Sequence, residues 1–310
     1  MQHRLIVIIG PTASGKTALA IRLAKKFNGE IISADSRQVY TGLDIGTGKA
    51  PRDKSKVKNQ NETYISDGIA HHLIDVSSPK RQFTVVQYQR LAQKAVSDIL
   101  RKNKVPIVCG GTGQYIDALV YGLAFPKVKP NRKLREKLER KPIKELFYML
   151  KKLDPRRSKT IDPHNSRRLI RALEIVLTTK RPVPTLAKKE PRYEALWLGL
   201  NPVKKILHHN IHKRLLARMK QGMVSEVKKL KKQGVSSRRL ESLGLEYRYI
   251  NRRLEGHLKK QQMIGQLERE IRNYAKRQMT WFGRNRDIHW ISVAKEAWHL
   301  VKRFLNRKKT

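Results

Sequence analysis

A phosphate-binding loop is the first chemical signal in this sequence. Its residues match the pattern G-x-x-x-x-G-K-[ST] at every position, and they are Gly10, Pro11, Thr12, Ala13, Ser14, Gly15, Lys16 and Thr17. Backbone N–H groups of such a loop cradle phosphate oxygens, the lysine adds a positive charge, and the threonine hydroxyl suits Mg²⁺. The pattern predicts a phosphate ligand without saying whether that ligand is ATP.

One carboxylate is placed to act on a ligand of this loop. Asp35 follows the apolar run EIISA, and the carboxyl end of a parallel strand beside a phosphate loop faces the ligand crevice. The alternative is that Asp35-Ser36 only caps a following helix. We favour catalysis because the loop is near. ATPases and GTPases usually end another strand with an Mg²⁺-binding aspartate, whereas VPIVCGGTGQY ends its run in Gly110-Gly111-Thr112.

Two further polar motifs are individually weak. Thr112 in GGTGQY follows an apolar run and could lie near the phosphates, although this motif lacks the third glycine of a dinucleotide fingerprint. The motif AHHLIDV offers His71, His72 and Asp75 as metal ligands. We interpret these three residues as structural, because adjacent histidines rarely face the same point and cations at phosphates prefer oxygen ligands.

Two clusters later in the chain allow both a functional and a structural interpretation. Arg167 and Arg171 lie on one face of a predicted helix, with Arg168 beside them. That face suits phosphodiester contacts, and a solvated charged face is almost as good an explanation. The aromatic pair Trp281-Phe282 fits a hydrophobic core better than a base-stacking platform.

The elements that must position these residues form an α/β fold: a parallel sheet that contains the phosphate loop and is covered by helices, with a basic helical insertion and C-terminal helices. Apolar runs predict strands and amphipathic spacing predicts helices, and their alternation indicates a parallel sheet. We expect strands at 4–9, 30–34, 105–111, 194–200 and 288–292, and helices at 16–27, at 84–103, from about 165 to 180, and between 202 and 280.

Composition changes along the chain suggest four parts. Residues 127–159 hold fourteen Lys or Arg and only four Asp or Glu, without a strand signal. We therefore predict the first part of the core at 1–125 and a basic helical insertion at 126–193, with two or three helices in its basic stretch followed by the helix from about 165. The core is completed, with basic helices, at 194–300, and a disordered tail follows at 301–310.

The net charge of the chain indicates what kind of partner it binds and does not indicate its fold. The chain has 69 Lys and Arg against 25 Asp and Glu, a net charge of +44. Nucleic acid or an anionic membrane would accept it, but no apolar run approaches the length of a spanning helix. A generally lysine-rich proteome is the alternative. The early first strand leaves no room for a signal peptide, and the single cysteine, Cys109, excludes an internal disulfide, so we expect a cytoplasmic protein with a polyanionic partner.

The motifs together resemble one family, the bacterial-type tRNA dimethylallyltransferases, also called tRNA isopentenyltransferases. The series GPTASGKT, ISADSRQVY, DIGTGKA, HHLIDV, GGTGQY, NSRRLIRALE, IHKRLLARMKQGMVSEV and AKRQMTW occurs in the family's order and runs from Gly10 to Trp281. The first two motifs are partly shared with other phosphate-loop proteins, whereas the whole series is specific.

The resemblance implies transfer of a dimethylallyl group from dimethylallyl diphosphate to N6 of the adenosine 3′ of the anticodon, with Mg²⁺ assisting. Asp35 corresponds to the general base, Lys16 and Thr17 to phosphate and metal ligands, Arg214 to a diphosphate-binding arginine, and Thr112 to a tRNA-contacting threonine. The whole loop Gly10–Thr17 would bind the donor diphosphate. The implied partner is the anticodon stem-loop of tRNA, bound by a monomer.

The implied tRNA contacts fall in four places and include the basic insertion. They are Asp35, Ser36, Arg37 and Gln38; Thr112; Arg135 with Arg167, Arg168, Leu169, Ile170 and Arg171; and Glu241, Ser242, Leu243, Gly244, Leu245 and Glu246. This last stretch, ESLGLEYR, departs from the commoner glycine-tyrosine form of the family.

Three other functions remain alternatives at the level of sequence. An adenylate isopentenyltransferase would use the same donor on a free nucleotide, which does not require a charge of +44. A phosphate-loop kinase would transfer phosphate from ATP. A non-catalytic RNA-binding protein would have no use for the intact Lys16, Thr17 and Asp35.

Overall fold

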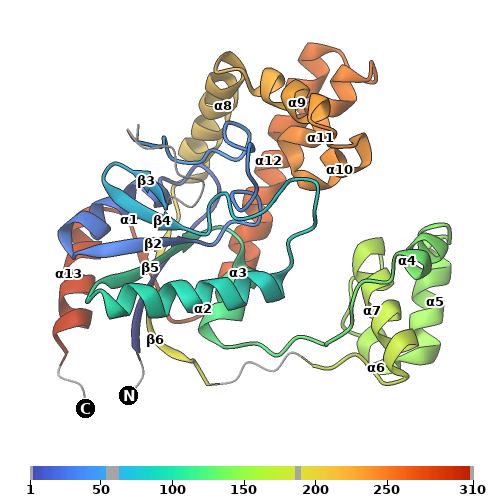
Figure 1. Ribbon diagram of the computed structural model, residues 1–310, viewed down its shortest axis with the longest axis horizontal. Helices are drawn as coiled ribbons and strands as arrows, with labels where there is room; N and C mark the ends of the chain where they lie inside the picture. The colour runs from blue at the N-terminus through green and yellow to red at the C-terminus, as the bar shows by residue number, and fades with distance from the viewer. Residues whose placement is uncertain (1–2, 54–62, 186–189, 308–310) are drawn as a thin grey trace. The chain divides into compact units, whose positions relative to one another are not determined.

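The fold is built on one seven-stranded sheet in the order β3-β4-β2-β5-β1-β6-β7 (Figure 1). The computed structural model describes residues 3–53, 63–185 and 190–307. All neighbouring strands are parallel except β3 and β4. The strands are β1 (His3–Ile9), β2 (Gly29–Ser33), β3 (Tyr64–Ser66), β4 (Ile69–His72), β5 (Val105–Gly110), β6 (Tyr193–Leu200) and β7 (Ile288–Ile291).

Helices connect and cover these strands. They are α1 (Lys16–Lys26), α2 (Val85–Arg101), α3 (Gly113–Val120), α4 (Arg132–Glu139), α5 (Ile143–Leu153), α6 (Pro155–Ser158), α7 (Ser166–Thr179), α8 (Lys204–Lys220), α9 (Met223–Lys232), α10 (Ser237–Leu243), α11 (Leu245–Leu254), α12 (Lys260–Phe282) and α13 (Ala294–Asn306). Local chemistry sets several boundaries: α2 begins with a capping box between Thr84 and Gln87, and the Asn165 side chain caps α7.

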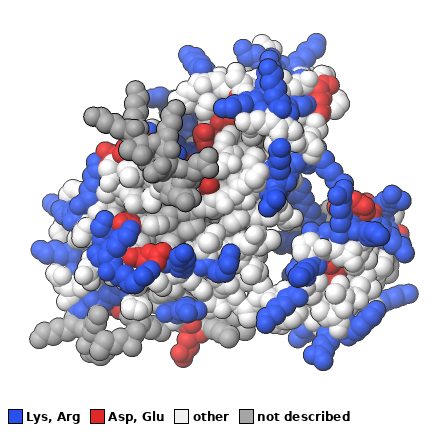
Figure 2. Space-filling view, in the orientation of Figure 1, with Lys and Arg blue, Asp and Glu red and all other residues white. Residues whose placement is uncertain are grey.

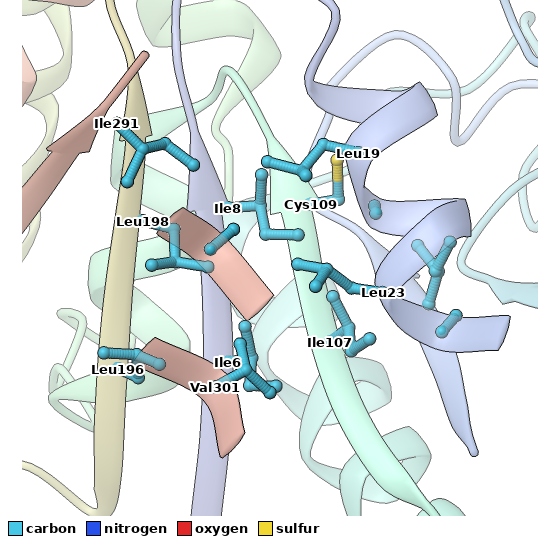
Figure 3. Packing of buried hydrophobic residues seen from close by; sticks show 14 of the residues in the cluster. Ile6, Ile8, Leu19, Leu23, Ile107, Cys109, Leu196, Leu198, Ile291 and Val301 are labelled. Carbon is cyan, nitrogen blue, oxygen red and sulfur yellow. The ribbon is translucent and has the colours of Figure 1, made fainter. Parts of the chain in front are cut away.

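The core follows from strand alternation. Ile6 and Ile8 of β1 lie on one face and pack with Leu19 and Leu23 of α1, while Leu198 of β6 extends the same cluster (Figure 3). The intervening residues of β1 point to the opposite face of the sheet and are equally buried. A strand buried on both faces reads as a continuous apolar run, which is the signal that predicted β1.

The described chain forms two compact units. The first combines residues 1–122 with 189–310 and contains the sheet. The second is the helical stretch 123–188, whose helices α4, α5, α6 and α7 pack around a core of their own that includes Leu146, Leu150, Leu169 and Leu173. The basic stretch therefore folds as a small helical bundle.

The predicted fold class is confirmed, and the elements differ from prediction in three places. The strands β3 and β4 and the helix α3 were not predicted, because each is short. The basic region between 202 and 280 contains two long helices, α8 and α12, and three shorter ones. The predicted disordered tail is wrong for residues 301–306: α13 runs to Asn306, and Val301 and Phe304 are buried in the core. The remaining predicted tail residues 308–310 lie outside the described residues.

Candidate active site

The candidate site lies where three adjacent parallel strands end. β1 leads into the phosphate loop, β2 into Asp35, and β5 into Gly111 and Thr112, with β5 between the other two. The turn after β2 and the turn after β5 are tied together: the backbone N–H of Thr112 donates to the carbonyl of Ala34 (3.1 Å), and the N–H of Ser36 donates to the Thr112 hydroxyl (3.1 Å). Thr112 thus lies beside the turn that carries Asp35; the sequence had only suggested a place for Thr112 near the phosphates.

The phosphate loop has the backbone that an anion cradle needs. Gly15 adopts a φ of 88° and Ala13 a φ of 66°, which is uncommon for a residue with a side chain. No side chain caps the start of α1, and no acidic residue occupies its first turn. The positive end of this helix is therefore available to a phosphate. The Lys16 ammonium donates to the Pro11 carbonyl across the loop (3.3 Å).

Two cations at the loop are held at an energetic cost. Burial lowers the pKa of Lys16, and the nearby charges of Arg214 and Arg218 lower it further. Burial and the Arg218 charge lower the pKa of Arg214 to about 10. The guanidinium of Arg214 donates to the Thr12 hydroxyl, which fixes it against the loop from helix α8. Positive charge crowded in this way is relieved when an anion binds.

Asp35 holds a tight turn and faces the same charges. One carboxylate oxygen accepts from the backbone N–H of Arg37 (2.8 Å) and of Gln38 (3.4 Å), so it organises a turn at 36–39 and no helix follows. Its negative charge partly offsets the lowering of the pKa values of Lys16 and Arg214 that burial causes. The structure brings the predicted base and the predicted diphosphate ligands together.

Sequence reasoning quoted the motif DIGTGKA but assigned no role to its loop or to the two residues that hold it. The backbone N–H groups of Asp44, Ile45 and Gly46 all donate to the carboxylate of Glu226 in α9, at 2.9, 2.7 and 3.0 Å. Arg218 donates to the Gly46 carbonyl (3.1 Å) and is buried. Its place one helical turn after Arg214 could have identified Arg218, because residues four apart share a helix face.

A third missed residue lies behind the phosphate loop. The side chain of Gln278 in α12 bridges the N–H of Thr12 (2.8 Å) and the carbonyl of Gly111 (2.9 Å), and it is almost fully buried. The motif AKRQMTW contains Gln278, but nothing in the residue types predicts that this amide spans two loops. Phe282, which directly follows this motif, is buried, as expected of a core residue.

The segment Glu241–Glu246 reaches the site only at its end. Glu246 lies 3.5 Å from Arg218, and its charge acts on the pKa of Arg214. Glu241 instead pairs with Arg248 and Arg252. The other members differ in exposure: Leu243 is fully buried, whereas Ser242, Gly244 and Leu245 are partly exposed.

The helical unit presents its predicted tRNA-contacting residues unequally. Arg167 and Arg168 are exposed, and Lys and Arg are abundant on this unit in Figure 2. Arg135 and Arg171 pair with the fully buried Glu174 at 2.7 and 2.6 Å. The side chains of Leu169 and Ile170 are buried in the unit's core, so they do not present a surface to RNA.

The residues near Thr17 fit a magnesium ion. Thr17 supplies a hydroxyl oxygen at the start of α1, and the buried Ser14 hydroxyl has no hydrogen-bond partner among the described residues. Oxygen donors of this kind suit Mg²⁺, which keeps several waters and takes substrate phosphates as ligands. In the described part of the chain, no group of three or more His, Cys, Asp or Glu could hold a metal, so phosphate oxygens would complete the set.

Two remaining predictions concern structure. His72 donates a hydrogen bond to the carboxylate of Glu30 (2.7 Å), His71 is buried edge-on against Tyr64, and Asp75 pairs with Lys49, so all three make packing or ion-pair contacts. None of the helices in the described ranges combines the length and apolar character that crossing a membrane requires.

Fold and site define a phosphate-loop α/β protein with a cationic clamp facing one carboxylate. The family model for IPP transferase matches residues 38–286. A tRNA dimethylallyltransferase of Acetivibrio thermocellus is 40% identical, covering 93% of this chain and 91% of that protein. The solved tRNA isopentenylpyrophosphate transferase of Staphylococcus epidermidis is 32% identical with a TM-score of 0.69, over 99% of this chain and 100% of that one. This chain belongs to the IPP transferase family.

A eukaryotic relative extends the likeness. The solved structure of a eukaryotic dimethylallyltransferase acting on tRNA has a TM-score of 0.77 and 26% identity, over 99% of this chain and 80% of that chain. The resemblance seen in the motifs is thereby confirmed at the level of the family.

Proposed function

We propose that this protein transfers a dimethylallyl group from dimethylallyl diphosphate to N6 of the adenosine that follows the anticodon of a tRNA, releasing diphosphate. One observation carries the proposal: Lys16 and Arg214 both bond to the phosphate loop at the end of β1, and Asp35 follows β2 at the same edge of the sheet. The clamp suits a diphosphate that gains charge as it leaves. The carboxylate suits a weakly nucleophilic amine that must lose a proton.

The step that this arrangement supports is a substitution at the allylic carbon. The bond between C1 of the donor and the diphosphate oxygen breaks, and its electron pair leaves with the diphosphate. A bond forms between C1 and N6 of adenine, and Asp35 takes the proton that N6 loses. The lone pair of N6 is delocalised into the ring, so removal of the proton during attack makes the nitrogen more reactive.

The phosphate loop stabilises the departing charge. Backbone N–H groups at the start of α1, the Lys16 ammonium and the Arg214 guanidinium are preorganised donors in a partly buried site, where they act more strongly than in water. Thr17 would hold Mg²⁺ together with the diphosphate oxygens. The ion supplies further neutralisation of the leaving group when it is bound.

The acceptor side of the site would receive an unstacked base. The turn Asp35–Gln38, Thr112 and Glu246 adjoin the reacting groups, so they are the residues we assign to the acceptor nucleotide. Arg167 and Arg168 are exposed and suit phosphate contacts. Arg135 and Arg171 are engaged by Glu174, and we assign them to holding this surface in place. We expect the enzyme to act as a monomer in the cytoplasm.

The test is a transfer assay with three acceptors and two donors. The protein is incubated with Mg²⁺, labelled dimethylallyl diphosphate and either unmodified tRNA, AMP or ATP, and the products are digested to nucleosides. We expect prenylated adenosine only from tRNA. Prenylation of the free nucleotides instead would indicate an adenylate isopentenyltransferase. Label transfer from γ-labelled ATP, with no prenyl product, would indicate a kinase and contradict the proposal.

A further inference from the structure

The buried amide of Gln278 joins the two halves of the site. Gln278 lies near the end of α12 and is 5% exposed. Its carbonyl oxygen accepts from the backbone N–H of Thr12 at 2.8 Å, and its NH₂ group donates to the backbone carbonyl of Gly111 at 2.9 Å. The first contact holds the phosphate loop after β1. The second holds the turn after β5.

The fit around this amide leaves little freedom. A side-chain carbon placed on Gly111 would lie 2.1 Å from the amide nitrogen of Gln278. One helical turn on, Trp281 packs against Gly113 and donates from its indole nitrogen to Asp117 in α3 (3.2 Å). The last turns of α12 are therefore anchored on both sides of Thr112, which fixes the position from which the amide reaches the two loops.

Each contact of Gln278 leads directly to a group in the proposed chemistry. Thr12, held through its N–H, accepts the hydrogen bond of Arg214 with its hydroxyl. Gly111 precedes Thr112, whose hydroxyl accepts from the N–H next to Asp35. A continuous set of hydrogen bonds thus runs from the diphosphate clamp, through one buried amide, to the turn that carries the base.

We propose that Gln278 is a positioning residue that sets the separation between the leaving-group clamp and the general base. The inference rests on the proposed prenyl transfer and adds a residue to it. Breaking the C1–O bond and forming the C1–N6 bond require donor and acceptor in line within a fraction of an ångström, and small misplacements of reacting groups cost large factors in rate. In the proposed reaction the donor engages the phosphate loop, and the acceptor engages the turns that carry Asp35 and Thr112. Loss of Gln278 therefore slows the chemical step more than it weakens the binding of either substrate.

The experiment compares Gln278→Met with wild type under single turnover. Methionine has a similar length and no amide, so both hydrogen bonds are lost while most of the volume is kept. The control is Gln266→Met, the same change at an exposed position of the same helix. We measure the rate of adenosine prenylation with saturating donor and tRNA, and separately the Kd for each substrate. We expect a loss of about 10- to 100-fold in the rate, Kd values within about threefold, and a control like wild type.

A second variant and a double mutant distinguish a positioning role from a general loss of folding. Gln278→Glu keeps the acceptor for Thr12 but cannot donate to Gly111 when ionised, and it should lose rate as well. If Gln278 acts through the turn that carries Thr112, combining Gln278→Met with Thr112→Val should cost clearly less than the product of the two single losses.

The outcomes separate this inference from the proposed function. Rates of folded Gln278→Met and Gln278→Glu within twofold of wild type would overturn the inference. A loss found wholly in the donor Kd would also overturn it, because Gln278 would then only build the donor site. Absence of transfer by the wild-type protein would count against the proposed function itself.

Discussion

Two clusters of charged side chains lie at opposite ends of the parallel strands. They differ in whether the charges within the cluster are balanced. At the carboxyl ends, Lys16, Arg214 and Arg218 crowd around a loop whose nearest carboxylate is Asp35. At the amino end of β2, the buried carboxylate of Glu30 is surrounded by Lys102, Lys104 and His72, at 3.2, 2.9 and 2.7 Å.

The pKa shifts show which cluster lowers and which raises the stability of the protein alone. Burial and like charge lower the pKa values of Lys16 and Arg214, so their charged forms are less stable in the fold than in the unfolded chain. Burial opposes the charge of Glu30, but hydrogen bonds from Lys104, His72 and Lys102 outweigh it and lower its pKa to about 2. A cluster of like charges that lowers the stability of the ligand-free protein is typical of a binding site, where a ligand of opposite charge balances it.

The helical unit repeats the second pattern. Burial would raise the pKa of Glu174, yet hydrogen bonds from Arg135, from the backbone of Asn131 and from Arg171 lower it. Arg135 and Arg171 thus resemble the lysines around Glu30 more than the cations at the phosphate loop. We therefore assign Arg135 and Arg171 to supporting the surface of the helical unit, and we leave the proposed tRNA contacts to its exposed arginines.

The largest expected effect is at the single carboxylate of the cationic cluster. Asp35→Asn keeps the turn-forming oxygen and removes the base, so the transfer rate should fall by about 10²- to 10⁴-fold. Donor binding should not weaken, because one negative charge near the clamp disappears. Rapid-quench transfer assays and a donor titration measure the two effects. Near-normal turnover of this variant would remove Asp35 from the role of base.

Lys16→Met tests two effects of the cationic cluster: its contribution to donor affinity and its effect on the stability of the ligand-free protein. Affinity for the donor should fall at least tenfold, since a charge that contacts phosphate is lost. The ligand-free protein should become more stable, with a Tm higher by about 1–4 °C at pH 7, because a cation with a lowered pKa destabilises the fold at every pH below that pKa. Calorimetry with and without diphosphate checks both points. A lower Tm in the absence of ligand would contradict the comparison.

Glu30→Gln should give the opposite result. The carboxylate has a lowered pKa, so its contribution to stability is present above the unfolded value near 4.5 and is lost as pH falls towards 2. We expect a loss of about 1–3 kcal/mol in the free energy of unfolding at pH 7 and a clearly smaller loss at pH 2.5, a pH close to the folded pKa. Transfer per folded molecule should stay normal. Urea titrations at both pH values measure this, and an equal loss at both would argue against the ionised cluster.

The smallest effect is at the surface of the helical unit. Arg167→Gln should weaken tRNA binding about equally for all tRNAs and reduce the slope of log affinity against log salt by about 0.7–0.9, the value for one phosphate contact. Filter binding across a salt series measures the slope. An unchanged slope would mean that Arg167 is only a solvated charge.

Local sequence patterns were enough to predict the fold class and the phosphate-loop part of the candidate site. The apolar runs of β1, β5 and β6 are continuous because both faces are buried, and the phosphate loop is contiguous, so each could be predicted from neighbouring residues. Reliance on neighbouring residues also explains why the tail prediction was wrong. RFLNRKKT reads as basic and polar, whereas Val301 and Phe304 of α13 are buried in one core cluster with Leu198 of β6 and Ile291 of β7.

What the sequence by itself determined was the chemistry available: a phosphate loop, a carboxylate at a strand end, an excess of cations, and a series of motifs that places the chain in its family. Tertiary structure decided which residues share the reaction. Gln278 lies 266 residues from Thr12 and Glu226 lies 180 residues from Gly46, and each meets its partner only because the parallel sheet gathers its loops at one edge. Hydrogen bonds between residues so far apart in sequence leave no periodic pattern that local reasoning could detect. The chain entropy that they cost is offset by the packing of the whole core.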